Sequence, residues 1–191
     1  MRLFVAFNLP ESVQRDIQNS LAPFRSFFQQ GSVRVRWVRP GQYHLTLKFL
    51  GEQPDNRAPL IQQALGEALR ETRSFSLTLA GFGCFPVHGP PQTLWMGVDQ
   101  GSDKLKQAVL SLEETLAKSG YPKEKRPFHG HLTLGRIQRT GNIQQFRASL
   151  RNTAGAPIGP IPVTSLDLMQ SRLGTGGPVY RLLGRAALKT G

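Results

Sequence analysis

Two identical tetrapeptides, at residues 44–47 and 131–134, hold the side chains of this chain that are best suited to chemistry. Both read His-Leu-Thr-Leu, and they are separated by nearly half of the 191 residues. The chain has only four histidines, so a chance repeat of the whole tetrapeptide is improbable. A third Leu-Thr-Leu at residues 77–79 follows Ser76, and the histidine is therefore the informative residue of the repeat.

The spacing within each tetrapeptide predicts how its side chains are presented. Alternate residues of a β-strand point to the same face, so each histidine projects beside its threonine while the two leucines point into a core. Two histidines near pH 7 can act as acid and base on opposite sides of a phosphorus centre, and threonine hydroxyls can donate hydrogen bonds to its oxygens. If the tetrapeptides face each other across a cleft, they form a catalytic pair, His44 and His131, with Thr46 and Thr133 beside the phosphate.

A metal site is the second use of clustered histidines that we considered. His129 and His131 are spaced so that they could chelate an ion, but Glu124 is the only acidic residue between residues 118 and 167. The single cysteine, Cys84, excludes a disulfide within the chain and a cysteine-based zinc site. We therefore expect neither a metal nor another cofactor.

The charge of the chain is strongly positive and unevenly distributed. Lys and Arg number 24 and Asp and Glu number 12, which gives a net charge of +12. Residues 118–191 carry most of this excess, with 12 basic and 2 acidic residues. Such a field attracts polyanions and phosphate esters, so we expect an anionic partner, although a basic surface can also serve solubility alone.

Hydrophobic periodicity predicts an α+β fold in which short connections favour antiparallel strand pairing over a doubly wound parallel sheet. Ser102 is the candidate cap of the third predicted helix. The predicted helices are residues 10–28, 59–70 and 102–118, and the predicted strands are residues 2–8, 34–38, 43–50, 75–79, 93–98, 131–137, 163–170 and 179–187. No apolar run approaches the roughly 18 residues of a membrane span, and the N-terminal apolar stretch is interpreted as a strand rather than a signal peptide. We therefore expect a cytoplasmic protein with no membrane partner.

At the paired tetrapeptides the sequence resembles the two-histidine phosphoesterase superfamily, whose members carry one H-x-T-x motif in each half. Within it the chain is similar to the bacterial RNA 2′,3′-cyclic phosphodiesterases, once described as 2′-5′ RNA ligases. The similarity covers essentially the whole chain, with its clearest blocks at residues 2–10, 44–51 and 126–136.

The resemblance implies a fold and a reaction. The fold is a bilobal α+β arrangement with pseudo-twofold symmetry, antiparallel sheets, flanking helices and a cleft between the lobes. Residues 1–191 would form a single bilobal catalytic domain with one motif per half, at residues 44–47 and 131–134. The reaction is the metal-free hydrolysis of a terminal 2′,3′-cyclic phosphate of RNA to a 2′-phosphate.

The resemblance also implies individual roles. His44 corresponds to the proton donor, and His131 corresponds to the proton acceptor that activates water. Thr46 and Thr133 correspond to phosphate-binding residues. The family can stack a base at the position of Phe49, for which core packing is the alternative, and it places a phosphate-contacting basic residue where Arg136 lies.

Three functions are compatible with these features. The first is a cyclic phosphodiesterase that acts on RNA with 2′,3′-cyclic phosphate ends. The second is a 2′-5′ RNA ligase that runs the reverse reaction, although abundant water favours hydrolysis and no nucleotide-binding loop is evident. The third is a non-catalytic RNA-binding module, which would have no need for two matched imidazoles. A monomer is expected in each case.

Overall fold

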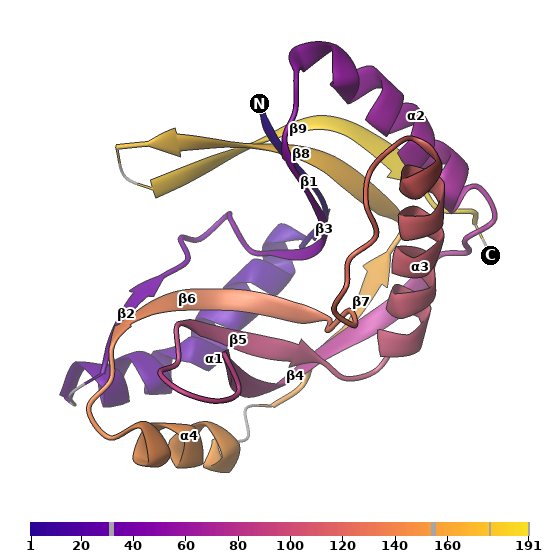
Figure 1. Cartoon of the computed structure of the whole chain (residues 1–191). Helices are drawn as coiled ribbons and strands as arrows, with labels where there is room; N and C mark the ends of the chain where they lie inside the picture. The colour runs from indigo at the N-terminus through magenta and orange to yellow at the C-terminus, as the bar shows by residue number, and fades with distance from the viewer. Residues whose placement is uncertain (31–32, 154–155, 176, 191) are drawn as a thin grey trace.

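The computed structural model describes residues 1–30, 33–153, 156–175 and 177–190 (Figure 1). The helices are α1 (Glu11–Gln30), α2 (Ala58–Leu69), α3 (Ser102–Lys118) and α4 (Ile143–Asn152), with a short 3-10 helix at Asp55–Arg57. The strands are β1 (Arg2–Asn8), β2 (Arg34–Trp37), β3 (His44–Glu52), β4 (Phe75–Phe85), β5 (Thr93–Val98), β6 (His131–Arg139), β7 (Ile158–Val163), β8 (Ser165–Gly174) and β9 (Gly177–Ala187).

All nine strands belong to one sheet with the order β7-β4-β5-β6-β3-β1-β8-β9, and β2 pairs with β6 beside this path. Every pair of named strands is antiparallel, which confirms the predicted α+β class with antiparallel pairing. The sheet has a narrow joint in its middle, because β3 and β6 are paired only through Leu45 and Leu132. One part of the sheet contains β1, β3, β8 and β9, and the other contains β2 and β4–β7, so the two parts are not the two halves of the sequence.

The helices pack on one face of this sheet and leave the other face for the site. Helices α2 and α3 pack against each other and against β3, β8 and β9, whereas α1 and α4 contact β2, β4 and β7. The apolar stripe of α1, which includes Val13, Ile17 and Leu21, is buried in the core together with Leu45 and Leu132. Figure 1 shows the sheet curled, with α2 and α3 on its outer side. No helix in the described ranges is long and apolar enough to cross a bilayer.

The sequence did not predict the 3-10 helix at Asp55–Arg57, helix α4 or strand β7, and the last two have physical explanations. Helix α4 is short, and it is preceded by the N-cap residue Asn142, whose side chain accepts a hydrogen bond from the backbone N–H of Gln145. Strand β7 contains two prolines, which cannot donate to a ladder and usually argue against a strand. It tolerates them because it lies at the edge of the sheet, paired only with β4.

Two predicted details are also corrected. Strand β4 continues to Phe85, six residues beyond the predicted end at Leu79, and thereby reaches the site. Ser102 does not cap α3, because the cap position is Gly101, whose φ of 78° lies in the left-handed region. A side chain at Gly101 would also lie 2.3 Å from the carbonyl oxygen of Ser76, so glycine is required for both reasons.

Candidate active site

The two tetrapeptides meet at the joint between the two parts of the sheet. Leu45 of β3 lies directly opposite Leu132 of β6, and both leucines are fully buried in the core. Their neighbours in sequence project from the opposite, concave face of the sheet, because side chains alternate along each strand. The structure thus brings together the four residues predicted from the repeat, all of them half-buried: His44, Thr46, His131 and Thr133.

Each motif strand has a β-bulge directly after its threonine. In β3, Thr46 pairs with Ala6 of β1 and Lys48 pairs with Val5, so that Leu47 is the extra residue. In β6, Thr133 pairs with Trp95 of β5 and Gly135 pairs with Leu94, so that Leu134 is the extra residue. The repeat therefore extends beyond the four letters to the backbone that follows them.

The bulges determine which later residues face the site. Strict alternation from His44 would place Phe49 on the core side, and the same count from His131 would place Arg136 there. The extra residue reverses the phase, so both side chains project from the concave face instead. Phe49 is 63% exposed, and the alternative that it packs in the core is therefore wrong. Arg136 is exposed and donates a hydrogen bond from Nη1 to Oγ1 of Thr93.

His44 is held in one orientation by the backbone carbonyl of Gln42 and by two aromatic rings. Its Nδ1 lies 2.8 Å from the carbonyl oxygen of Gln42, which can only accept, so Nδ1 carries the proton and Nε2 is free to act. The ring centroids of Phe4 and Tyr180 lie 5.2 Å and 4.9 Å from that of His44. Burial lowers the pKa of His44 below its ordinary value, against a smaller opposing effect of the hydrogen bond to Gln42.

His131 has the same backbone contact in a different surrounding. Its Nδ1 lies 2.8 Å from the carbonyl oxygen of His129, which again leaves Nε2 free. The Phe85 ring stands edge-on to His131 at 5.0 Å, and the His129 ring is stacked at 6.2 Å. Burial lowers the pKa of His131, and the positive charges of His129 and Arg136 lower it further, against the hydrogen bond to the His129 carbonyl, which raises it.

The concave face therefore presents two imidazoles with matching tautomers, two hydroxyls, an exposed phenyl ring and a guanidinium. Near neutral pH, two imidazoles can exchange protons with a bound group from two sides. The hydroxyls and the guanidinium are suited to an anion, since both donate hydrogen bonds. Among the residues that the structure describes, no three His, Cys, Asp or Glu side chains are grouped so that they could hold a metal ion.

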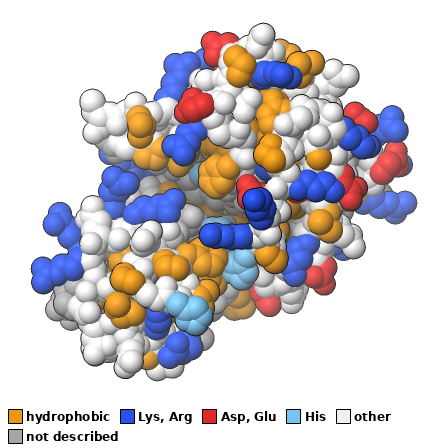
Figure 2. All heavy atoms as spheres, in the orientation of Figure 1, with side chains coloured by type: hydrophobic (Ala, Val, Ile, Leu, Met, Phe, Trp, Pro, Cys, Tyr) orange, Lys and Arg blue, Asp and Glu red, His pale blue; other side chains and the backbone are white. Residues whose placement is uncertain are grey.

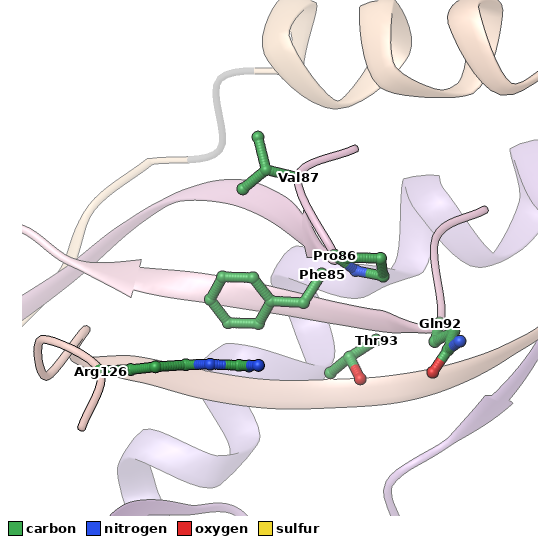
Figure 3. A pocket seen from close by; sticks show the side chains of 6 residues that line it. All are labelled: Phe85, Pro86, Val87, Gln92, Thr93 and Arg126. Atoms are coloured by element: carbon green, nitrogen blue, oxygen red, sulfur yellow. The ribbon is translucent and has the colours of Figure 1, made fainter. Parts of the chain in front are cut away.

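A groove of about 450 Å³ lies beside the second motif (Figure 3). Figure 3 shows Phe85 and Val87 along the groove, with Arg126 on its other side and Thr93 and Gln92 at one end. The groove adjoins the site, because Phe85 contacts His131 and Thr93 accepts the hydrogen bond from Arg136. Figure 2 shows the surface hollowed between the β8–β9 hairpin and β6, with Lys and Arg side chains around the hollow.

The sequence interpretation missed the aromatic side chains that surround the two histidines. Trp95 was placed on a predicted strand, but only the pairing of β5 with β6 shows that it shares a face with Thr133. Phe85 lay beyond the predicted end of β4, and Tyr180 reaches His44 only through the β8–β9 hairpin. Alternation along β9 would have identified the face on which Tyr180 lies, but not that His44 is its neighbour.

Comparison with known proteins gives a consistent result. The family model described as "LigT like Phosphoesterase" matches the chain twice, over residues 12–95 and 97–180, and each match contains one tetrapeptide. An RNA 2′,3′-cyclic phosphodiesterase of Aeropyrum pernix is 32% identical over 165 residues, which cover 85% of this chain and 92% of the relative.

Solved structures share the fold over nearly the whole chain. The structure of E. coli LigT in apo form has a TM-score of 0.76 and 28% identity, and the match covers 98% of this chain and 96% of the other. The structure of E. coli LigT complexed with 3′-AMP has a TM-score of 0.74 and 27% identity, with the same coverage.

Proposed function

The chain belongs to the LigT-like phosphoesterase family, and from this premise we propose that it is an RNA 2′,3′-cyclic phosphodiesterase that acts on RNA ends in the cytoplasm. The whole chain would act as one bilobal catalytic domain, with one motif in each part of the sheet. One observation carries this proposal: two imidazoles on adjoining strands, each with Nδ1 on the carbonyl of the residue two positions earlier and Nε2 free. A structural histidine would have no reason to repeat this arrangement.

The proposed reaction uses the two free Nε2 atoms in opposite directions. His131 accepts a proton from water as the water oxygen bonds to phosphorus. The bond from phosphorus to the 3′ oxygen breaks, and His44 gives its proton to that oxygen. The product carries a 2′-phosphate and a free 3′-hydroxyl, and the pair returns to its starting state by exchanging one proton with solvent.

The remaining predicted residues act on the charge and the base of the substrate. The hydroxyls of Thr46 and Thr133 donate to the non-bridging oxygens, whose negative charge grows as water attacks. The guanidinium of Arg136 contacts the phosphate from the second motif strand, and Phe49 offers a stacking surface for the terminal base. The complex of E. coli LigT with 3′-AMP supports a site of nucleotide size in this fold.

The lowered pKa of each histidine fits the two roles differently. A lowered pKa keeps His131 neutral near pH 7, as a base requires. An acid must instead be protonated, and the bound phosphodiester supplies a negative charge that raises the pKa of His44 toward this state. Substrate binding thus prepares the acid, while the base is ready beforehand.

The test is a turnover assay with a nucleoside 2′,3′-cyclic phosphate in excess chelator, with the product isomer identified by phosphorus NMR. We expect conversion to the 2′-phosphate at the same rate with and without chelator, because the two imidazoles carry the proton transfers. Activity abolished by chelator and restored by one metal would contradict the two-histidine mechanism. RNA binding without any turnover would instead identify a binding module, and a 3′-phosphate product would contradict the assignment of the leaving oxygen.

A further inference from the structure

The edge of the sheet beside the second motif carries two pairs of arginines that face each other across neighbouring strands. Arg36 of β2 lies directly opposite Arg136 of β6, and Arg34 lies opposite Arg139. We call these four exposed residues the arginine ladder. Like charges directly opposite each other on neighbouring strands destabilise a sheet. None of the salt bridges found in the described part of the chain includes any of the four.

The ladder lies on the same face as the two histidines. On β2, Val35 and Trp37 pack against the core, so the alternate residues Arg34 and Arg36 point to the concave face. On β6, Arg136 pairs with Thr93, and Thr133 pairs with Trp95 two residues further along β5, so Arg136 and Thr133 share a face. The ladder therefore continues the site outward from Thr133, in the direction away from the joint with β3.

The bulges keep the charges on this face. Without the extra residue Leu134, Arg136 would point to the core side. A second irregularity between Arg34 and Val35 leaves Gln138 of β6 without a partner in the pairing with β2, so Arg139 comes to lie opposite Arg34. The bulge at Leu134 and the irregularity between Arg34 and Val35 thus place guanidinium groups side by side that regular pairing would separate.

We propose that the arginine ladder binds the phosphodiester backbone of the RNA strand on the 5′ side of the terminal nucleotide, a proposal that rests on the proposed cyclic phosphodiesterase function. Arginine is suited to this role because its planar fork donates two hydrogen bonds to one phosphate. The strand from Arg136 to Arg139 spans about 10 Å at about 3.3 Å per residue, enough for one or two phosphates. A nucleoside 2′,3′-cyclic phosphate has no such phosphate and would not contact the ladder.

The experiment compares three substrates: a nucleoside 2′,3′-cyclic phosphate, the same compound with an added 5′-phosphate, and a single-stranded oligonucleotide with a 2′,3′-cyclic phosphate end. The variant R34Q/R36Q/R139Q removes three rungs and spares Arg136. The control variant K104Q/K118Q removes two exposed positive charges from α3, on the outer side of the sheet. The value of kcat/KM is measured for each substrate from low to physiological salt.

We expect the ladder variant to show at least a 10-fold lower kcat/KM on the oligonucleotide at low salt and to stay within twofold of wild type on the nucleoside substrate. The slope of log kcat/KM against log salt should become shallower by about 0.7 for each phosphate that the variant no longer neutralises. The compound with a 5′-phosphate should lie between the other two. An equal decrease on all three substrates, or the same selective decrease in the α3 control, would overturn the proposal.

The proposal can fail separately from the proposed function. If wild-type protein hydrolyses none of the substrates, the cyclic phosphodiesterase function is wrong, and the ladder is then tested by fluorescence anisotropy with a 3′-phosphorylated oligonucleotide. Unchanged oligonucleotide affinity in the ladder variant would overturn the proposal. Because the ladder variant removes like charges, its thermal unfolding midpoint should equal or exceed that of the wild type. The single variant R139Q repeats the comparison of substrates with a smaller change to the protein.

Discussion

The first and second motif strands have the same backbone course but different neighbours. In both strands, the histidine Nδ1 donates a hydrogen bond to the backbone carbonyl of the residue two positions earlier, and a β-bulge follows the threonine. The rings against His44 come from Phe4 and Tyr180, whereas His131 shares its surroundings with His129 and a nearby Arg136. A repeated backbone thus supplies two imidazoles with equivalent backbone contacts, and the surrounding side chains are what differs between them; the proposed division into proton donor and proton acceptor rests on that difference.

The second residue after the extra residue of each bulge shows the same contrast. Phe49 follows the first bulge and Arg136 follows the second, and both project from the concave face. One strand therefore offers an apolar ring and the other a cation, at equivalent places on the concave face. The repeated backbone therefore places equivalent positions around the site, and the side chains at these positions differ between the two motif strands.

Replacing the histidines tests this division most directly. We expect His44→Ala and His131→Ala each to lower turnover by about 10²–10⁴-fold, because each removes a proton transfer. The effect of the double variant should be smaller than the product of the two single effects, since the pair acts as a unit. His88→Ala is the matched control, because His88 lies in the exposed loop after β4. Near-wild-type turnover in either single variant, or an equal decrease in His88→Ala, would contradict the assignment of His44 and His131 as a catalytic pair.

The pH profile separates the two roles. A base must be neutral, so His131 should produce the limb that rises with pH, and a protonated acid, His44, should produce the limb that falls. Because burial lowers both pKa values, the kcat/KM profile of the free protein should have its maximum below about pH 6.5. His131→Ala should remove only the rising limb and His44→Ala only the falling one. Disappearance of the same limb in both variants would mean that the roles are not divided.

The sequence predicted much of this arrangement and could not predict the rest. Alternation in the tetrapeptides correctly placed His44 and Thr46 on one face, because the prediction needs only the local strand geometry. Strand β5 and helix α3 begin and end as predicted, since their apolar patterns are regular. The bulges after Thr46 and Thr133 have no comparable signal, because they depend on pairing with β1 and β5, which are distant in sequence.

The residues beneath the two bulges differ as well, and they lead to a stability prediction. Lys48 is buried, with Nζ 2.7 Å from Glu113 of α3 and 2.9 Å from the carbonyl oxygen of Pro122. The loop that leads to the second motif is held by the same carboxylate, which accepts from the backbone N–H of Glu124 at 3.1 Å. The equivalent residue, Gly135, has no side chain, and a Cβ there would lie 2.5 Å from Val35.

Lys48→Met should lower the free energy of unfolding by about 3–5 kcal/mol, because it leaves the buried carboxylate of Glu113 unpaired. Adding Glu113→Leu should recover much of this stability, since the double variant buries no charge. Gly135→Ala should lower the free energy of unfolding by about 1–3 kcal/mol through overpacking against β2. Urea unfolding of the three variants and the wild type measures these differences. If the double variant is no more stable than Lys48→Met, the unpaired carboxylate is not the source of the destabilisation.

The residues after the bulges should give a smaller effect that divides between binding and chemistry. Phe49→Ala should weaken binding by about 1–3 kcal/mol and raise KM with little change in kcat, because stacking acts on the ground state and the transition state alike. Phe49→Tyr should restore KM. Arg136→Gln should instead lower kcat as well, because its charge acts on the developing negative charge of the phosphate. Steady-state kinetics on one cyclic nucleotide measures kcat and KM for both variants. Equal effects on KM and kcat in both variants would mean that Phe49 and Arg136 do not divide between binding and chemistry.

The smallest expected effect concerns the residues whose carbonyls hold the histidines, Gln42 and His129. Each carbonyl survives substitution, so any change reports the side chain alone. Burial is the main cause of the lowered pKa of His131, and the charge of His129 adds to it, so His129→Gln should raise that pKa. The rising limb of the pH profile should then move to higher pH, with a decrease of a few-fold in kcat/KM on its acid side.

Gln42→Ala is the control. It removes only a hydrogen bond from the Gln42 side chain to the carbonyl of Pro178 and no charge, so the falling limb of His44 should stay in place. A shift of both limbs in either variant would mean that the two histidines titrate as one group rather than as separately tuned acid and base.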